Sequence, residues 1–419
     1  MAQARGWRVR GCDRAAAGAQ ARALLRAGIP VEAEDSPSPK GAGAIIYTTA
    51  VGRDSPAIRF ALENRLPLIS RADLLAALMA DSPTRIVVAG MHGKSTTVGM
   101  LAAILEEAGL SPSVAGGAPL TPGGDAYRIG GERVFLAEGC EYRDAFLSLS
   151  PTLAVVTNID HDHPDYFPDL GAVKSSFLRF LMSSPACVLG GDCQALSDIA
   201  PANAVLFGYA PNCHLRGQDC GEGLRVARGD TELGTLTLAV TGRYNRENAL
   251  AATAAALELG VPFPVIQKAL CDFHGVGRRM EYRGVFQGAR VFLDYAHHPT
   301  EITAALGGID ERRGRILCIY QPHTFTRTAA LWEGFVSALG KADKTLLLDI
   351  YPAREAPLPG ITSARLAAEA GTDYAADFPA ALAWAKENAK PGDILLIMGA
   401  GDIYQLADAL APKMPPRGT

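Results

Sequence analysis

The stretch that decides the fold is Ile86-Val87-Val88-Ala89-Gly90-Met91-His92-Gly93-Lys94-Ser95-Thr96-Thr97. Its first four residues are apolar without alternation, which is typical of a strand buried on both faces. The following stretch, Val98–Gly109, is largely apolar and ends in glycine, so it predicts a helix that ends there. Strand, glycine loop and helix in this order predict a P-loop, in which backbone N–H groups and the helix dipole hold the phosphates of a nucleotide.

The polar residues of this loop suit nucleotide chemistry. Lys94 can reach the outer phosphates, and Ser95 or Thr96 can hold a magnesium ion. The glycine spacing is shorter than usual, because Gly90 lies only three residues before Gly93. We predict that the loop binds ATP or GTP. The alternative is an ordinary helix start with an incidental lysine.

The composition excludes several classes of protein. A chain of 419 residues is too long for one ordinary core and predicts two or three domains. Hydrophobic residues make up 48% and charged residues 20%, which is typical of a soluble globular enzyme, and the net charge of −4 gives no reason to expect nucleic acid as a partner. Eight cysteines without a Cys-x-x-Cys pair indicate reduced thiols in a cytoplasmic protein. The chain has no run of about 18 apolar residues and no secretory pattern at its start, so we predict neither a membrane span nor export.

Residues 1–82 predict a small Rossmann-like domain. Strands are expected at Trp7–Cys12, Ala44–Thr49 and Leu66–Ile69, and helices at about Ala15–Ala27 and Pro56–Asn64. This alternation predicts a parallel sheet. A nucleotide-binding domain of this type normally opens with a strand and a glycine-rich turn. We therefore expect this stretch to lack its first strand and glycine loop.

The central region, residues 83–283, brings polar side chains to one edge of its predicted sheet. The buried strand Val134–Ala137 ends in Glu138-Gly139-Cys140-Glu141, and the buried strand Leu153–Ile159 ends in Asp160-His161-Asp162-His163. Ligands of parallel sheets bind at the carboxyl ends of the strands. We therefore expect both polar groups to lie beside the P-loop.

Carboxylates and an imidazole beside a P-loop can hold one or two Mg²⁺ ions that bridge nucleotide and acceptor oxygens. Glu138 and His163 are the first choices for this role. A zinc site made of Asp160, His161 and His163 is one alternative. An exposed polar turn beside Pro164 is the other.

Two later motifs also suit a nucleotide. Asn248 precedes the alanine-rich helix Ala249–Gly260, and its amide can pair with adenine through one donor and one acceptor, although asparagine at a helix start is usually a cap. Arg278 and Arg279 follow the turn Gly275-Val276-Gly277 and suit a phosphate. A pair of solvated arginines explains the second motif equally well.

The last region, residues 284–419, predicts a second doubly wound domain. Its buried strands are expected at Val291–Leu293, Ile316–Tyr320, Thr345–Leu348 and Asp393–Met398. Each ends in polar or glycine residues, among them Asp294-Tyr295-Ala296-His297-His298, Gln321-Pro322-His323, Asp349 and Gly399-Ala400-Gly401-Asp402. We expect this domain to close its site against the P-loop domain.

Seven ordered motifs between about Gly6 and Asp402 resemble those of the Mur ligases, in particular the alanine-adding branch. They are Gly-Met-His-Gly-Lys-Ser-Thr, Thr-Asn-Ile-Asp-x-Asp-His-x-Asp, Gly-Arg-x-Asn-x-x-Asn-Ala-Leu, Gly-Val-x-Arg-Arg-x-Glu, Asp-Tyr-Ala-His-His-Pro-Thr-Glu-Ile, Gln-Pro-His-x-x-x-Arg-Thr and Gly-Ala-Gly-Asp-Ile. The resemblance accounts for the short glycine spacing, because the loop of that family is Gly-x-x-Gly-Lys-[Ser/Thr]. It implies an α/β chain of three domains: a Rossmann-like N-terminal domain, a central P-loop ATPase domain and a C-terminal doubly wound domain.

The resemblance also implies an ATP-dependent amide synthesis. In that family the carboxylate of UDP-N-acetylmuramate attacks the γ-phosphate to give an acyl phosphate, and the amine of L-alanine then displaces phosphate through a tetrahedral intermediate. Two alternatives remain: a recycling ligase that attaches a whole tripeptide to the same sugar, and a non-catalytic nucleotide-binding paralogue. A monomer and a dimer are both consistent with the sequence.

The family's roles transfer onto matching positions. The residues that the resemblance assigns to ATP are Gly90, His92, Gly93, Lys94, Ser95, Thr96, Asn248, Arg279 and Asp294. Those assigned to Mg²⁺ are Ser95, Glu138 and His163. Those assigned to catalysis are Lys94, His163, His297, His298 and Arg327, and those assigned to the substrate are Glu141, Asp162 and His323.

Some positions depart from the family's pattern. Its Glu-Ala-Asp-Glu is Glu138-Gly139-Cys140-Glu141 here, so that one carboxylate is lost, and Tyr244 stands in place of a histidine. Relatives with a carbamylated lysine would carry it near Phe177. Lys174 is out of register with that position, as in the alanine-adding branch.

Overall fold

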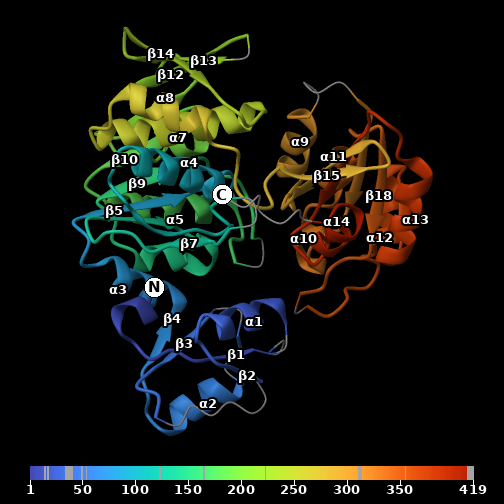
Figure 1. Cartoon of the computed structure of the whole chain (residues 1–419), viewed down its shortest axis with the longest axis horizontal. Helices are drawn as coiled ribbons and strands as arrows, with labels where there is room; N and C mark the ends of the chain where they lie inside the picture. The colour runs from blue at the N-terminus through green and yellow to red at the C-terminus, as the bar shows by residue number, and fades with distance from the viewer. Residues whose placement is uncertain are drawn as a thin grey trace.

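The computed structural model describes residues 1–13, 16, 18–33, 41–48, 51–52, 54–121, 124–163, 166–221, 223–309, 314–353 and 355–412. Three α/β lobes follow one another along the chain (Figure 1). We call the part before strand β5 (Thr84–Ala89) the N-terminal lobe, the part from β5 to helix α8 (Phe263–Cys271) the central lobe, and the part from strand β15 (Glu281–Phe286) onward the C-terminal lobe.

The N-terminal lobe contains two separate pairs of parallel strands, rather than the single sheet that the sequence predicts. Strand β1 (Gly11–Asp13) pairs with β2 (Val31–Ala33), and β3 (Ile45–Tyr47) pairs with β4 (Leu68–Ser70). The accompanying helices are η1 (Gln3–Arg5), α1 (Ala19–Arg26), α2 (Pro56–Glu63) and α3 (Arg71–Met79). Strands of three residues share few hydrogen bonds, and few of this lobe's described side chains are buried. Few interactions therefore join the two strand pairs into one sheet. Residues 14, 15, 17 and 49, at the ends of an expected helix and strand, lie outside the described residues.

The central lobe is built on a ten-stranded sheet in which β5 lies between β8 (Val134–Glu138) and β9 (Leu153–Val156), parallel to both. The other strands are β6 (Ser113–Ala115), β7 (Tyr127–Arg128), β10 (Cys187–Gly190), β11 (Val205–Gly208), β12 (Leu215–Cys220), β13 (Gly223–Arg228) and β14 (Thr231–Thr237). The last three form an antiparallel extension, which carries the sheet to one end of the lobe (Figure 1).

Helices cover both faces of this sheet, as the apolar run of β5 predicts. Ile86 and Val88 face a core shared with α4 (Lys94–Glu107), α7 (Arg243–Glu258) and α8. Val87 and Ala89 face the opposite core, shared with α3 and α5 (Leu170–Met182). All four side chains are fully buried. Two short elements, η2 (Tyr142–Ser148) and α6 (Gln194–Ser197), follow β8 and β10.

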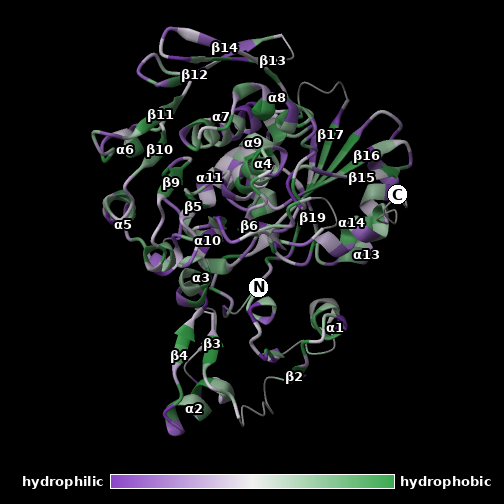
Figure 2. Ribbon diagram, turned by 60° about the vertical axis from the view of Figure 1, so that its left-hand side comes forward, coloured by the Kyte–Doolittle hydropathy of each residue, from purple (hydrophilic) through white to green (hydrophobic). Residues whose placement is uncertain are grey.

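The C-terminal lobe has a six-stranded sheet in the order β15-β16-β20-β17-β18-β19. Its strands β16 (Ala289–Asp294), β17 (Ile316–Tyr320), β18 (Lys344–Leu348), β19 (Asp373–Ala375) and β20 (Ile394–Met398) are parallel, and only β15 is antiparallel. The helices are α9 (Pro299–Gly307), α10 (Phe325–Ala330), α11 (Trp332–Leu339), α12 (Ser363–Ala370), α13 (Phe378–Asn388) and α14 (Tyr404–Leu410). Strands β16 and β17 are largely hydrophobic (Figure 2), and their residues face two cores, one shared with α13 and α14 and the other with α9, α11 and α12. The expected doubly wound sheet is therefore present.

Two expectations from composition can be compared with the structure. The eight cysteines are free thiols. Within the described part of the chain, no helix is both long and apolar enough to cross a membrane.

Candidate functional site

The loop between β5 and α4 has the backbone of a P-loop. Gly90 and Gly93 adopt positive φ values of 131° and 84°, which other residues adopt only with strain. A Cβ at Gly90 would also collide with Thr157, and one at Gly93 with Asn248. Both glycines are therefore required by conformation and by close contact.

Lys94 lies at the base of this loop and is paired with a buried carboxylate. Its Nζ donates to the carbonyl oxygens of Gly90 (2.6 Å) and Met91 (3.1 Å), and to both carboxylate oxygens of Glu141 (3.2 and 3.0 Å). Burial alone would lower the pKa of Lys94, but the carboxylates of Glu141 and Glu138 together outweigh it and raise that pKa. Burial would raise the pKa of Glu141, but Lys94 and His163 together hold it below its usual value. Both groups are therefore charged, and His163 Nε2 lies 3.5 Å from the same carboxylate.

The predicted magnesium ligands lie on two sides of this pair. Ser95 Oγ donates to Glu138 Oε2 at 2.8 Å, and the same oxygen accepts from the backbone N–H of Gly117. His163 has a positive φ of 54°, and its ring packs against Tyr142 with the centroids 4.7 Å apart. Two consecutive residues thus contact different carboxylates. Lys94 contacts Glu141, which also lies beside His163, and Ser95 contacts Glu138. Hydroxyl and carboxylate oxygens are the donors that Mg²⁺ prefers, so Ser95 and Glu138 fit the ion, whereas His163 offers a ring nitrogen and lies against Glu141.

A cavity of about 410 Å³ lies between the central and C-terminal lobes. The predicted nucleotide residues that line it are His92, Gly93, Thr96, Asn248, Arg279 and Asp294. Phe207, Tyr244 and Glu247 also line it. Its size is that of a small-molecule site. Because both lobes contribute to the lining, the cavity exists only when they are in contact.

The two arginines after the glycine turn point in different directions. Arg279 faces the cavity and lies 3.6 Å from Glu301. Arg278 instead donates to the carbonyl oxygens of Gly399 (3.4 Å) and Gly401 (3.2 Å) in the C-terminal lobe. The phosphate interpretation therefore applies to Arg279 only, and Arg278 connects the turn to the loop after β20.

Asp294, at the end of β16, is held by backbone donors. Its two carboxylate oxygens accept from the N–H groups of Met280 and Ala296, each at 2.7 Å. Burial raises the pKa of Asp294 despite the nearby charge of Arg279. Its position is therefore set by two segments that meet at the junction of the lobes.

The two adjacent histidines of the C-terminal lobe are held differently. His297 Nδ1 donates to the carbonyl oxygen of Tyr295 at 2.9 Å, and burial lowers the pKa of His297 to about 3, so the ring is neutral. His298 caps α9, because its Nδ1 accepts from the N–H of Thr300 at 3.3 Å. The opposite nitrogen of His298 is buried and has no hydrogen-bond partner among the described residues, so it can serve a ligand.

Arg327 and His323 complete the polar groups of the C-terminal lobe. Arg327 Nε donates to Asp162 Oδ1 at 3.2 Å, and both side chains are buried at the contact between the lobes. His323 stacks on Tyr351 with the centroids 5.6 Å apart and lies 3.5 Å from Arg327. Burial lowers the pKa of His323 to about 4. Asp162 is thus no part of an exposed turn; Pro164 and Asp165 lie outside the described residues.

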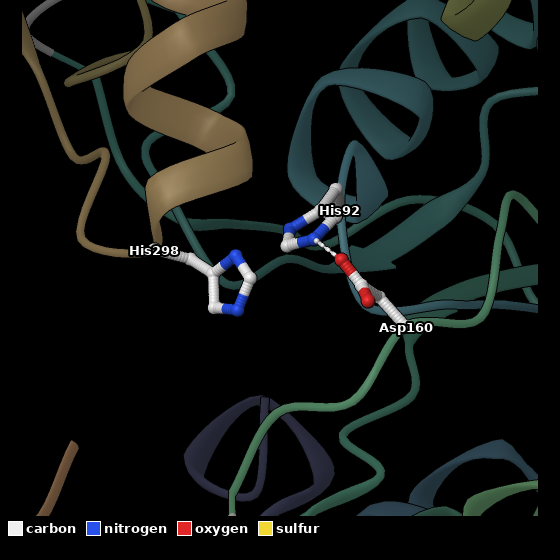
Figure 3. Close-up of side chains that lie close together, drawn as sticks. All are labelled: His92, Asp160 and His298. Carbon is white, nitrogen blue, oxygen red and sulfur yellow. Dashed lines mark hydrogen bonds and ion pairs between the residues drawn. The ribbon is translucent and has the colours of Figure 1, made fainter. Parts of the chain in front are cut away.

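The structure disagrees with the predicted zinc set of Asp160, His161 and His163. His161 Nε2 donates to the carbonyl oxygen of Phe167 at 3.0 Å, and His163 faces Glu141. A different trio, His92, Asp160 and His298, has donor atoms within 4.8 Å of one another (Figure 3). Burial would lower the pKa of His92, but hydrogen bonds and charges from Asp160 and Glu301 raise it to about 9. His92 is thus paired with two carboxylates, Asp160 and Glu301, while His298 caps α9.

The departures from the family pattern have distinct positions. Tyr244 lines the cavity, where it takes the place of the family's histidine. Burial raises the pKa of the Cys140 thiol, so Cys140 does not replace the charge of an aspartate. Lys174 pairs with Asp198 at 2.7 Å on the surface, away from the P-loop groups.

Sequence reasoning missed several residues that line the cavity, Phe207 and Glu247 among them, and the one with the most charged contacts is Glu301. It lies in the first turn of α9 and contacts His92, Arg279 and His297. A glutamate three residues into a helix is normally interpreted as a capping residue. Its place in the motif Asp-Tyr-Ala-His-His-Pro-Thr-Glu-Ile was the signal available.

Three family descriptions match successive parts of the chain: "Mur ligase family, catalytic domain" at residues 1–83, "Mur ligase middle domain" at residues 134–256 and "Mur ligase, glutamate ligase domain" at residues 278–401. The chain is 39% identical over 381 residues to a UDP-N-acetylmuramate–L-alanine ligase of Oleidesulfovibrio alaskensis, covering 87% of this chain and 84% of that protein. It is 37% identical over 391 residues to the protein of the same name from Caldicellulosiruptor bescii, covering 89% and 86%. The solved structure of a UDP-N-acetylmuramate-alanine ligase from Thermotoga maritima superposes with a TM-score of 0.82 over 98% of this chain and 94% of that chain, and at 24% identity it shows the shared fold. The chain belongs to the Mur ligase family.

Proposed function

We propose that this protein joins L-alanine to the carboxylate of UDP-N-acetylmuramate, with ATP and Mg²⁺, through an acyl phosphate, as a step of peptidoglycan synthesis. The observation that carries the proposal is the cavity beside the P-loop, whose lining comes from the central and C-terminal lobes together. The names of the curated relatives, 35 to 39% identical over most of their length, support the same reaction.

The residues present suit the two cofactors. In this proposal the phosphates of ATP lie over Gly90–Thr96 and the adenine lies near Asn248, with Arg279 and Asp294 facing the nucleotide from the junction. Ser95, Glu138 and His163 would hold Mg²⁺, which supplies charge neutralisation of the transferred phosphoryl group.

The chain's own side chains supply charge, orientation and a dry site. Lys94 is a fixed cation beneath the phosphates, and Arg327 is a second cation at the lobe contact. The neutral rings of His297 and His323 can accept or donate hydrogen bonds without adding charge near the amine. Contact between the lobes excludes the water that would hydrolyse an acyl phosphate.

We further propose that each of the three regions of the chain binds a different substrate. Residues 1–82 would hold the UDP sugar, 83–283 the ATP and 284–419 the amino acid. The reaction would take place in the cytoplasm, in keeping with eight free thiols.

The first test measures ADP release with UDP-N-acetylmuramate and, in turn, L-alanine, L-serine, glycine and the L-alanyl-γ-D-glutamyl-diaminopimelate tripeptide. We expect release to depend on L-alanine. Strict dependence on the tripeptide would instead identify the recycling ligase. ADP release that does not depend on any acceptor would contradict the ligase assignment.

The second test separates the enzyme from a non-catalytic paralogue. Lys94→Ala removes the cation beneath the phosphates and should lower turnover by about 100- to 1,000-fold, the loss typical of a transition-state charge contact. Lys174→Ala, which breaks only an exposed pair with Asp198, is the matched control and should leave turnover unchanged. Circular dichroism checks that both variants fold. Unchanged cell-wall synthesis in cells that rely on Lys94→Ala would favour the paralogue.

A further inference from the structure

Glu301 places one carboxylate between two lobes. Its Oε1 lies 3.3 Å from Nδ1 of His92 in the P-loop and 3.6 Å from Nη1 of Arg279. Its Oε2 accepts from the backbone N–H of His297 at 3.0 Å and lies 3.3 Å from the ring nitrogen Nδ1 of the same residue. One oxygen therefore contacts the P-loop side of the site and the other contacts the histidine loop, residues 295–298.

His92 and Arg279 beside this carboxylate are charged and largely withdrawn from water. The side chain of Glu301 is 10% exposed and that of His92 is 17% exposed. Burial would raise the pKa of Glu301, but the hydrogen bond to His92 and the positive charges of His92 and Arg279 hold it well below its usual range. An ion pair this sheltered is weakly screened by salt and fixes the geometry of its partners.

His92 is held from both sides, which makes the contact specific. Its other nitrogen, Nε2, lies 3.3 Å from Asp160 Oδ2, and that oxygen also accepts from Thr300 Oγ1 at 3.2 Å. Figure 3 shows His92 between Asp160 and the loop that carries His298. The first turn of α9 therefore meets the central lobe at two adjacent points: Glu301 contacts His92 of the P-loop, and Thr300 contacts Asp160, the other partner of His92.

From this arrangement we propose that Glu301 is a positioning residue that links closure of the C-terminal lobe over the P-loop to the placement of His297. The proposal rests on the proposed ligase function. Glu301 acts through His92 and His297, and it orients the groups that meet the phosphates and the amine. To bridge both partners, the side chain at this position needs the negative charge and the full length of glutamate.

This role predicts a particular kinetic signature. Arg279 and His92 offer positive charge to the phosphates, and the charge of Glu301 offsets part of it. Removing that charge should therefore leave the KM for ATP unchanged or lower it. The kcat should fall, because His297 and the P-loop lose their common partner. A misplacement of about 1 Å is enough for a loss on the order of 100-fold.

The experiment compares Glu301→Gln, Glu301→Asp and the matched control Glu369→Gln in the full-length chain, with ATP and L-alanine kinetics. Glu369 is an exposed glutamate of the same lobe, paired with Arg365. We expect Glu301→Gln to lower kcat by about 10- to 100-fold, with the KM for ATP within about twofold of the wild type or below it. Glu301→Asp keeps the charge but is one methylene shorter, so it should remain impaired, whereas Glu369→Gln should match the wild type. Full recovery with Glu301→Asp would overturn the bridging role, as would an unchanged kcat with Glu301→Gln.

A second measurement does not depend on the acceptor. Small-angle X-ray scattering with a non-hydrolysable ATP analogue reports how compact the three lobes are. We expect the wild type with the analogue to be more compact than Glu301→Gln. His92→Gln removes the same contact from the other lobe and should also be less compact than the wild type, so it carries the test if Glu301→Gln does not fold. Equal compactness of wild type and His92→Gln would overturn the proposal. If the wild type shows no turnover with alanine, the proposed function fails while this comparison still tests Glu301.

Discussion

At the scale of the residue, three histidines show that the surrounding groups set the protonation state of a side chain. His92 lies between two carboxylates, which raise its pKa to about 9. Burial lowers the pKa of His297 to about 3 and that of His323 to about 4. At neutral pH the first is a cation of the P-loop and the other two are neutral rings in the C-terminal lobe. The same residue type therefore supplies charge on one side of the site and uncharged hydrogen-bonding groups on the other.

The raised pKa of His92 predicts a pH dependence of stability. A group whose pKa is higher in the folded state contributes its full stability below the unfolded pKa of about 6.5, and loses it as the pH rises through the folded value of about 9. The wild type should therefore unfold at a higher temperature than His92→Gln at pH 6, and the difference should shrink by pH 10. Thermal unfolding of both proteins across this range measures it. A difference that grows with pH would contradict the protonated state of His92.

At the scale of the element, the strand–loop–helix unit of β5 and α4 owes its shape to its glycines as much as to its apolar residues. Gly90 and Gly93 permit the turn, and Gly99 permits close packing of α4. A Cβ at Gly99 would collide with Val276 and lie 3.3 Å from ring atoms of Phe273. The helix that begins at the phosphate site is thereby packed against the segment that leads to Arg279.

We predict opposite effects of one substitution in two helices. Gly99→Ala gains up to about 1 kcal/mol of helix propensity, but overpacking of this core should cost about 1 to 3 kcal/mol, so the midpoint of thermal unfolding falls. Gly307→Ala at the end of α9 meets open space and should stabilise by about 0.4 to 1 kcal/mol. Differential scanning calorimetry measures both. If Gly99→Ala raised the midpoint, the close packing of α4 would be refuted.

At the scale of the whole molecule, the proposed function depends on contacts between the central and C-terminal lobes, which each have cores of their own. The central sheet is packed on both faces, and the C-terminal sheet has two cores of its own. The buried pair of Arg327 and Asp162 crosses between them, as do the contacts of Glu301. The nucleotide cavity is a property of the assembled lobes.

The inter-lobe pair should matter more than an equivalent pair on the surface. Asp162→Asn leaves Arg327 buried without a full countercharge, which should cost up to about 3 kcal/mol and lower kcat/KM by about 10- to 100-fold. Asp198→Asn, which breaks the exposed pair with Lys174, should change neither. Thermal unfolding and ADP-release kinetics of the two variants provide the comparison. Similar behaviour of both variants would show that the lobes close without this pair.

The sequence by itself determined the local units. The apolar run before Gly90 and the glycines within the loop specify β5, the P-loop and α4, because strand burial and turn geometry depend on neighbouring residues. The ends of β8, β16 and β17 were predictable to within one residue for the same reason, since polar residues follow each apolar run. Strand β9 ends at Val156, three residues before its predicted end. The order of the motifs identified the family, and with it Arg327, which no local pattern singles out.

Only the tertiary structure decided which of these groups meet. His92 and Glu301 are 209 positions apart and Asp162 and Arg327 are 165 apart, so nothing in the local sequence links them. Folding also turned His161 toward the carbonyl oxygen of Phe167 and Arg278 toward the loop at Gly399, so His161 is engaged away from the alternative zinc set and Arg278 away from a phosphate. The physical reason is that hydrogen bonds and ion pairs depend on distance and burial in three dimensions, whereas spacing along the chain encodes only the local backbone.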